Sequence, residues 1–104
     1  MGLTFKITYS EQFDKDIQDI YAYIVGNLRN PEAASSQIFR LFSSAESLAL
    51  FPKRNRVRMK DTHGNDIRLM PVDNYVIAYS INEADHVVNI SRAFYARRDF
   101  DRLI

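Results

Sequence analysis

The chain contains no cysteine or tryptophan, only three glycines and three prolines, and no long apolar run in its 104 residues. Without cysteine it has no disulfide framework, no thiolate nucleophile and none of the sulfur ligands that structural zinc usually takes. Its few glycines form neither a phosphate-binding loop nor a nucleophile elbow. Without a long apolar run, no membrane-spanning helix is expected. These features set aside the common enzyme classes and fit a protein of the reducing cytoplasm.

What is present is a globular composition, with 46% hydrophobic and 26% charged residues. A chain of this length has room for a single hydrophobic core, so we expect one domain spanning residues 1–104. The first ten residues alternate between apolar and polar types and lack the apolar core of a secretory signal. They are therefore expected to belong to the fold.

Positive charge is concentrated in the second half of the chain. Residues 1–52 carry four basic and six acidic side chains, whereas residues 53–104 carry ten basic and seven acidic ones. The densest segment is residues 53–60 (KRNRVRMK), with five basic side chains. Such a run attracts an anionic partner, although a solvated loop accounts for it equally well.

Hydrophobic periodicity predicts the order β-α-α-β-β-β. Ser10 and Asn30 are suitable N-caps for the two helices, and Phe51-Pro52 stops the second. Links of two and four residues join the last three strands into a meander of antiparallel hairpins. We therefore expect an α+β fold in which a helical hairpin packs on one face of a small, mainly antiparallel sheet. The predicted strands are residues 3–9, 67–72, 75–81 and 86–94. The first helix is expected to follow Ser10 and to end near residues 26–28, and the second to start at Asn30-Pro31.

The last predicted strand carries an arginine at an inward position. Alternation places Val88, Ile90 and Phe94 toward the helices. The same alternation places Tyr95 on the opposite face of the sheet, which the helices do not cover. By the same alternation Arg92 falls on the apolar side, where a guanidinium needs a carboxylate partner, a bulge that turns it outward, or a free edge. Internal pairing therefore competes with a functional role for Arg92.

Two further arginines, Arg97 and Arg98, follow this strand. Asp99 and Asp101 come directly after them and can satisfy one guanidinium locally. Guanidinium groups bind phosphate in a two-pronged geometry and stay charged at any working pH. A free one beside Tyr95 therefore suits a polyanion or an acidic protein surface.

Other candidate side chains have simpler interpretations. His63 and His86 are isolated in or beside turns, which favours surface histidines over metal ligands. Tyr75 and Tyr79 alternate on one face of the middle strand, a pattern more typical of core packing than of base stacking. Arg68 is a further candidate cation, although a strand arginine beside tyrosines can simply stack.

Three stretches of the chain resemble the RelE/ParE superfamily of toxins from bacterial type II toxin-antitoxin modules, once called plasmid stabilisation proteins. They are residues 8–24 (TYSEQFDKDIQDIYAYI), residues 30–52 (NPEAASSQIFRLFSSAESLALFP), and the meander from Ile67 to Asp99. The most specific is the last, in which RLMPVDNYVIAY is followed by a strand ending in Tyr-x-Arg-Arg-Asp.

This resemblance implies a β-α-α-β-β-β fold and growth arrest that is cancelled by a co-encoded antitoxin, whose tail, often helical, wraps the toxin. It also implies one of two mechanisms. RelE-like members cut messenger RNA in the ribosomal A site, using arginine, lysine and tyrosine side chains. ParE-like members poison DNA gyrase and cleave nothing themselves.

Two positions separate the chain from the RelE-like pattern. An arginine commonly follows the middle-strand tyrosine there, whereas this chain has Val76. A catalytic tyrosine near the C-terminus is also usual, but the chain ends in DFDRLI. Its Tyr-x-Arg-Arg-Asp segment is closer to the ParE-like pattern. We therefore predict a cytoplasmic toxin that inhibits DNA gyrase and is neutralised by a cognate antitoxin.

The residues expected to bind the target or the antitoxin are Arg54, Arg56, Arg58, Lys60, Arg68, Tyr95, Arg97 and Arg98. One alternative is a ribosome-dependent, metal-independent endoribonuclease acting on messenger RNA. Its catalytic candidates are Tyr95, Arg92, Arg97, Lys60 and His86. A second alternative is a basic interaction module without toxicity. Neither a metal nor another cofactor is expected in any of these cases.

Overall fold

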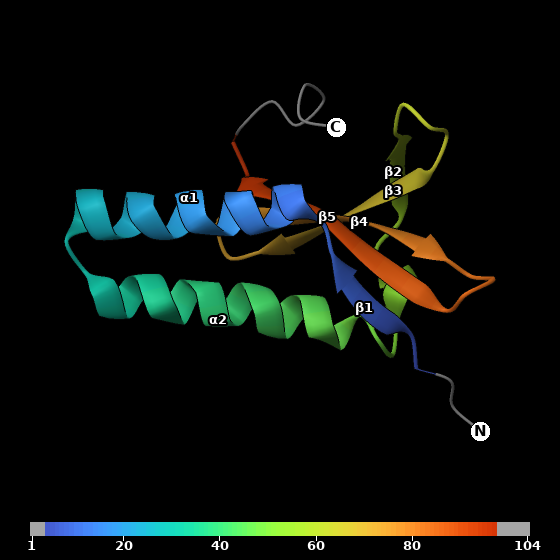
Figure 1. Cartoon of the computed structure of the whole chain (residues 1–104), viewed down its shortest axis with the longest axis horizontal. Coiled ribbons are helices and arrows are strands. Elements are labelled where there is room, and N and C mark those ends of the chain that lie inside the picture. Colours follow the sequence, from blue (N-terminus) through green and yellow to red (C-terminus); the bar gives the residue numbers. More distant parts are fainter. Residues whose placement is uncertain (1–3, 98–104) are drawn as a thin grey trace.

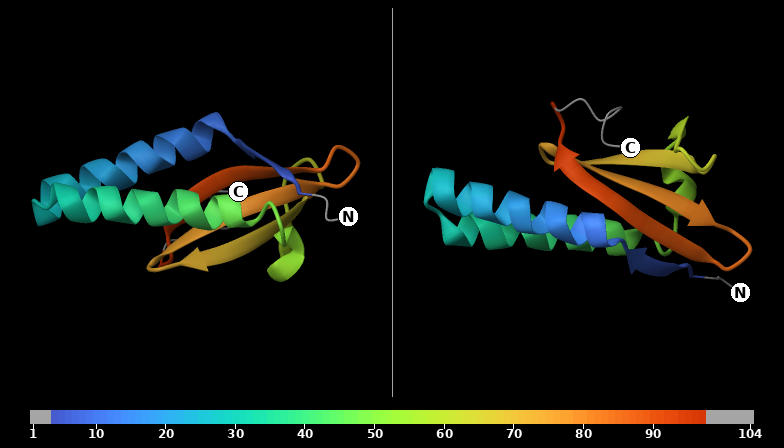
Figure 2. Two further views of the ribbon diagram at one scale, coloured as in Figure 1. Left: turned by 90° about the horizontal axis from the view of Figure 1, so that it is seen from below. Right: turned by 45° about the horizontal axis from the view of Figure 1, so that its top comes forward.

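In the computed structural model, residues 4–97 are described, and they form a helical hairpin and a five-stranded sheet (Figure 1). The hairpin projects beyond one end of the sheet (Figure 2). Among these residues, neither helix is long and apolar enough to cross a membrane. The elements are β1 (Lys6–Tyr9), α1 (Glu11–Leu28), α2 (Pro31–Ser47), the 3₁₀ turn η1 (Pro52–Arg54), β2 (Val57–Lys60), β3 (Asp66–Val72), β4 (Tyr75–Asn82) and β5 (Val87–Tyr95).

The predicted α+β class and the helical hairpin are confirmed, but the sheet has one strand more than the sequence predicted. This strand, β2, lies inside the basic segment 53–60 and pairs antiparallel with β3. Its cations hide the apolar alternation on which strand prediction depends. It is defined by the pairing of Val57 with Arg68, of Met59 with Ile67 and of Lys60 with Asp66, with an irregularity between Val57 and Met59.

The strand order is β1-β5-β4-β3-β2, with β1 parallel to β5 and the other neighbours antiparallel. The hairpin returns the chain to the sheet beside β1, where the Phe5 N–H donates to the Ala49 carbonyl at 2.8 Å. The first strand needs a partner for its backbone, and this partner is β5. The two edges of the sheet are therefore β1 and β2.

Each helix begins at the predicted cap. The Ser10 hydroxyl accepts a hydrogen bond from the Phe13 N–H at 3.0 Å, and the Asn30 side chain accepts one from the Ala33 N–H at 3.0 Å. These bonds satisfy donors that the first turn of a helix leaves unpaired. The short link, in which Arg29 has φ of 50°, makes the two helices antiparallel neighbours.

The main core lies between the hairpin and one face of the sheet. The face of β4 that carries Tyr75 and Tyr79 is part of it, and along this stripe Ile77 and Tyr79 are fully buried. The Tyr79 hydroxyl donates to the Pro52 carbonyl at 2.7 Å and accepts from the Asn55 amide at 3.2 Å, so its burial leaves no polar group unsatisfied. The interpretation of this stripe as core is confirmed. The fully buried hydrophobic side chains of this cluster are Phe13, Ala34, Leu41, Ala45, Leu48, Ile77, Tyr79, Val88 and Ile90.

The predicted position of Phe94 is wrong. Opposite the helices, the sheet carries a second small cluster in which Ile67, Ala78 and Phe94 are buried. The cause is a bulge in β5, because Tyr79 pairs with Ile90 while Ala78 pairs with Arg92. One extra residue reverses the alternation of every side chain that follows it. Phe94 therefore points away from the helices.

Candidate functional site

The site lies where β1 ends and the start of α1 replaces it as the neighbour of the β5 edge. Because β1 ends at Tyr9, the end of β5 has no strand neighbour on this side among residues 4–97. The Ser10 N–H donates to the Ile90 carbonyl at 3.0 Å, and its hydroxyl donates to the Ser91 carbonyl at 2.7 Å. The start of α1 thus satisfies the strand edge at the bulge.

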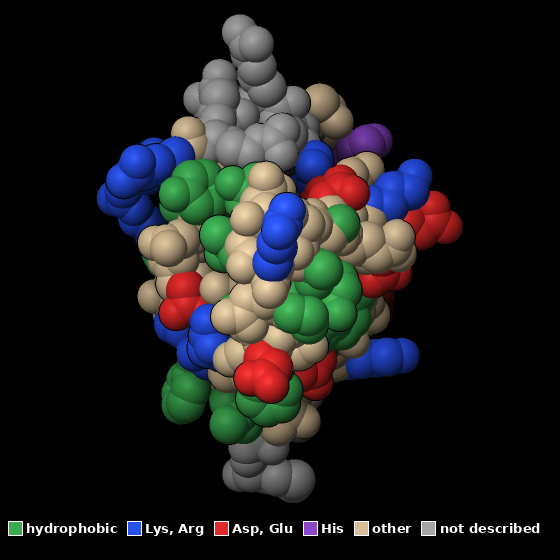
Figure 3. Space-filling view, turned by 90° about the vertical axis from the view of Figure 1, so that its left-hand side faces the viewer, with side chains coloured by type: hydrophobic (Ala, Val, Ile, Leu, Met, Phe, Trp, Pro, Cys, Tyr) green, Lys and Arg blue, Asp and Glu red, His purple; other side chains and the backbone are tan. Residues whose placement is uncertain are grey.

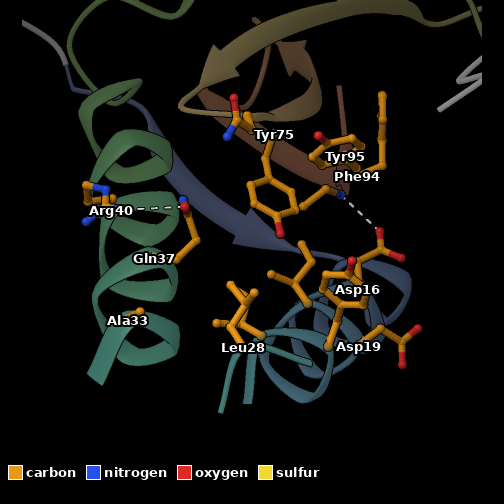
Figure 4. Close-up of a pocket in the computed structure, with 14 residues that line it drawn as sticks. Asp16, Asp19, Leu28, Ala33, Gln37, Arg40, Tyr75, Phe94 and Tyr95 are labelled. Carbon is orange, nitrogen blue, oxygen red and sulfur yellow. Dashed lines mark hydrogen bonds between the residues drawn. The ribbon is translucent and has the colours of Figure 1, made fainter. Parts of the chain in front are cut away.

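Asp16, six residues after Ser10 on α1, holds the strand beyond the bulge (Figure 4). Its carboxylate accepts from the Arg92 guanidinium at 2.8 and 3.1 Å and from the Ala93 N–H at 2.9 Å. The Asp16 residue is only 7% exposed, so the pair is shielded from solvent. The bulge reverses Arg92 as well, because Arg92 pairs with Ala78 of the cluster opposite the helices, so its predicted position on the helix side is wrong. Arg92 nevertheless has the carboxylate partner, the neighbouring bulge and the unpaired strand edge that were expected as ways to accommodate it. Its geometry is that of a structural residue.

A groove of about 710 Å³ opens between the two helices and the end of the sheet. Apolar and aromatic side chains dominate it, and at its mouth Tyr23 is 60% and Leu28 65% exposed. At the end of the molecule that Figure 3 faces, hydrophobic side chains form patches between charged ones. Large exposed apolar side chains around a concavity mark a binding surface. The groove is lined by Asp16, Asp19, Ile20, Tyr23, Ile24, Leu28, Ala33, Gln37, Arg40, Asn74, Tyr75, Ala93, Phe94 and Tyr95.

Two tyrosines form the sheet side of the groove. Tyr75 and Tyr95 are cross-strand neighbours whose rings meet edge to face, with centroids 5.8 Å apart. Burial raises the pKa of Tyr75, and the nearby phenols of Tyr23 and Tyr95 raise it further. The Tyr75 hydroxyl points between the helices and stays protonated at neutral pH (Figure 4). Tyr95, predicted to face away from the helices, is instead beside Tyr75 because the bulge reverses the alternation.

The opposite rim is fixed by an exposed ion pair. Arg40 of α2 donates to Asp73 at 2.7 Å, and Gln37 donates to the same carboxylate oxygen at 3.0 Å. The hydrogen bond from Arg40 is the largest of the effects that lower the pKa of Asp73, followed by the one from Gln37. Asp73 also has φ of 56°, which the tight β3–β4 turn requires. The turn is thereby held against α2.

One predicted binding arginine lies beside this groove. The Ala96 N–H donates to the Asn74 carbonyl at 2.8 Å, which anchors the chain just after Tyr95. Arg97 follows, exposed and without a hydrogen bond or ion pair to any residue from 4 to 97. It can engage an anionic partner without giving up an internal contact within that part of the chain. Arg98, the neighbouring candidate, lies outside the described residues.

The remaining predicted cations lie around β2, with β3 and β4 between them and Tyr95, a separation of about 14 Å across the sheet. Arg54 donates to carbonyls of Phe51 and Ser47 and so closes the end of α2. Lys60 pairs with Asp66 at 2.6 Å. The predicted binding residues therefore belong to two surfaces. Of the others around β2, Arg68 donates to the Asn55 carbonyl, Arg58 is exposed, and Arg56 is exposed without a hydrogen bond or ion pair to residues 4–97.

The candidates for RNA cleavage are dispersed. His86 stands just before β5 and stacks on Phe5, with ring centroids 4.8 Å apart. Tyr95 ends the same strand, about 30 Å away at the usual rise per residue. Lys60 is on the edge strand β2 and Arg92 is paired to Asp16. Between residues 4 and 97, no three histidine or carboxylate side chains converge to hold a metal ion.

Sequence reasoning missed the helical side of the groove. Leu28, the last residue of α1, is mostly exposed because α1 extends beyond the sheet at this point. Asp16, Ile20 and Tyr23 follow each other at helical spacing, which was a usable signal that they share a face. Nothing local in the sequence indicates that Gln37 and Arg40 lie across from them.

Comparisons with known proteins agree with this fold. The family described as the ParE toxin of the type II toxin-antitoxin system parDE matches residues 7–100. The chain is similar to the chromosomal ParDE system from P. aeruginosa, at 14% identity and a TM-score of 0.73 over 90% of this chain and 98% of that one. A comparison with curated proteins finds no match.

Two further solved structures share the fold. The archaeal RelE-RelB complex from Pyrococcus horikoshii OT3 has 20% identity and a TM-score of 0.62, covering 92% of this chain and 99% of that one. The RelBE2 toxin-antitoxin complex from Mycobacterium tuberculosis has 13% identity and a TM-score of 0.63, covering 89% and 92%.

Proposed function

Because the chain belongs to the ParE toxin family of type II toxin-antitoxin systems, we propose that it arrests growth by poisoning DNA gyrase and that a cognate antitoxin holds it inactive. It acts in the cytoplasm as a single domain. The fold shared with solved toxin-antitoxin systems supports the antitoxin as a partner. ParE-like members of the superfamily poison gyrase, which supports gyrase as the target of this toxin.

The observation that carries this proposal is the dispersal of the acid-base candidates. Metal-independent RNA cleavage needs a group that activates the 2′-hydroxyl and cations that stabilise the charged phosphate, all at one point. Among the described residues, His86 and Tyr95 are at opposite ends of β5, and Lys60 is paired on another strand. Such an arrangement favours a toxin that works by binding.

The surface that we assign to the target is the groove together with Tyr95 and Arg97. Tyrosine and arginine are the residue types that most often dominate binding energy when they sit beside a desolvated pocket. Tyr95 is 41% exposed and is held by Tyr75, so little conformational freedom is lost on binding. Arg97 adds a guanidinium suited to an acidic protein surface or to DNA phosphate.

The proposal is tested with purified toxin, DNA gyrase and supercoiled plasmid. We expect the toxin to trap gyrase on cleaved DNA in proportion to its concentration, and addition of the antitoxin to prevent this. Reactions without gyrase give the control, since the toxin alone should leave the plasmid intact. Unchanged supercoiling by gyrase in excess toxin would remove gyrase as the target.

Expression of the toxin in bacterial cells separates the alternative functions. Primer extension on messages from arrested cells should show no new ends at A-site codons, and such ends would instead establish a RelE-like endonuclease. Expression of the toxin alone should prevent colony formation. Normal colonies would favour an interaction module without toxicity.

A further inference from the structure

The end of β5 is anchored at two points. From α1, the Asp16 carboxylate accepts the Ala93 N–H at 2.9 Å. Three residues later, the Ala96 N–H donates to the Asn74 carbonyl of the β3–β4 turn at 2.8 Å. Arg97 follows directly and has no hydrogen bond or ion pair of its own to residues 4–97. Its position therefore depends on Ala96, and through Ala96 on the β3–β4 turn.

This turn has a backbone conformation that needs support. It consists of Asp73 and Asn74, because Val72 pairs with Tyr75 on either side of it. Asp73 has φ of 56°, in the left-handed region that a side chain makes unfavourable. A residue in such a conformation keeps it only where the surrounding structure holds it. The contacts of the Asp73 side chain therefore determine how firmly Asn74 is placed.

The second helix, α2, holds Asp73 through a network of side chains. Arg40 donates to the Asp73 carboxylate at 2.7 Å and Gln37 donates to it at 3.0 Å. The guanidinium of Arg40 is itself fixed, because it donates to the Ser36 hydroxyl at 2.6 Å and to the Gln37 side chain at 3.3 Å. Figure 4 shows Arg40 and Gln37 on α2, across the groove from Tyr95. A charged network with several hydrogen bonds fixes a geometry better than an isolated surface ion pair.

We propose that Arg40 and Gln37 are positioning residues for the target-binding end of β5. Through Asp73 they fix the β3–β4 turn, and the turn fixes Ala96 and hence Arg97. Neither side chain needs to touch the target to have this effect. The inference rests on the proposed function, because it takes Arg97 as a contact to the target.

Amide hydrogen exchange, measured by NMR on the full chain, tests the geometry. Arg40→Ala should speed exchange of the Ala96 amide about tenfold, because the turn that accepts its hydrogen bond is released. The Ala93 amide is the internal control, since it is bonded to Asp16 and should change less than about twofold. Unchanged exchange at Ala96 would overturn the inference. So would faster exchange at both amides, which would show that Arg40 supports the fold as a whole.

Trapping of gyrase on cleaved DNA tests the functional consequence. Arg40→Ala and Asp73→Gly should each raise the toxin concentration needed for half-maximal trapping about tenfold, because Arg97 then loses its fixed position. Glycine adopts a positive φ without strain, so Asp73→Gly removes the carboxylate and keeps the turn. The matched control is Lys15→Ala, which removes an exposed cation of α1 and should change trapping less than about twofold.

The two single variants separate positioning from direct contact, since they change the net charge in opposite directions. An electrostatic contact between Arg40 and the target would be weakened by Arg40→Ala and strengthened by Asp73→Gly, whereas lost positioning weakens trapping in both. The double variant should be no more than about twofold worse than either single one, because both remove the same interaction.

Opposite effects of the single variants, or additive losses in the double variant, would overturn the inference. Unmodified toxin without any effect on gyrase would instead remove the proposed function. In that case the exchange of the Ala96 amide would still decide whether Arg40 positions the end of β5.

Discussion

At the scale of single residues, Asp16 fixes the path of β5 after its bulge. Its buried carboxylate accepts from the Arg92 side chain and from the Ala93 backbone at the same time. A buried carboxylate of this kind persists only when its charge and its lone pairs are satisfied. The bond to Ala93 aligns the last residues of β5, and therefore Tyr95, with the groove.

Replacing Asp16 with alanine should destabilise the fold by about 3 kcal/mol, because it leaves the Arg92 charge partly buried and unpaired. Urea unfolding, followed by circular dichroism, measures this change. Asp14→Ala is the control, since Asp14 is exposed in the first turn of α1 and should cost less than about 1 kcal/mol. Equal stability of the two variants would show that the buried pair contributes nothing.

The ion pair on the other rim of the groove predicts a pH dependence. Arg40 lowers the pKa of Asp73, so the pair stabilises the folded state above the ordinary pKa of the carboxyl group. This contribution is lost as the pH falls through the lower pKa of the folded state. NMR titration of the Asp73 carboxyl group in Arg40→Ala should show its pKa rising toward the ordinary value of about 3.9.

Asp61 provides the internal control for that titration. Hydrogen bonds within its own turn, first from the Asn65 backbone, lower its pKa, so Arg40→Ala should leave it unchanged. If the pKa of Asp73 also stayed unchanged in this variant, the ion pair would not form in solution.

At the scale of secondary structure, the sequence predicts those features that depend on residues close together in the chain. Ser10 and Asn30 mark the helix starts because a cap acts within three residues. The helices and the meander strands follow from their periodicity for the same reason. The bulge in β5 and the strand β2 were not predicted, because both depend on pairing with a strand that is distant in sequence.

Ser10 takes part in both a local and a long-range interaction, since it caps α1 and also bonds to the bulge in β5. Ser10→Ala should therefore cost about 2 kcal/mol, more than a typical cap, because two hydrogen bonds are lost. Thermal or urea unfolding measures the change. Ser35→Ala, at an exposed position of α2, is the matched control and should stay within about 0.5 kcal/mol. A cost no larger than that of the control would argue against this connection.

At the scale of the whole molecule, the basic side chains divide into two groups. Arg97 lies beside a groove formed by both helices and the end of the sheet, whereas Arg56 lies at the edge strand β2. The resemblance to the RelE/ParE superfamily, made from three stretches of sequence, is confirmed by the family match over residues 7–100. The groove could not be predicted in the same way, because its walls come from segments whose spatial relation only the fold creates.

The toxin is proposed to act by binding through the end of β5, and gyrase-dependent DNA cleavage in the presence of two double variants tests this most directly. Tyr95→Ala/Arg97→Glu should trap at least about tenfold less cleaved DNA than the unmodified toxin, because it removes both proposed contacts. Lys60→Ala/His86→Ala removes two nuclease candidates away from the groove and should trap as much as the unmodified toxin. Loss of trapping in the second variant with full trapping in the first would show that the toxin does not act through the end of β5.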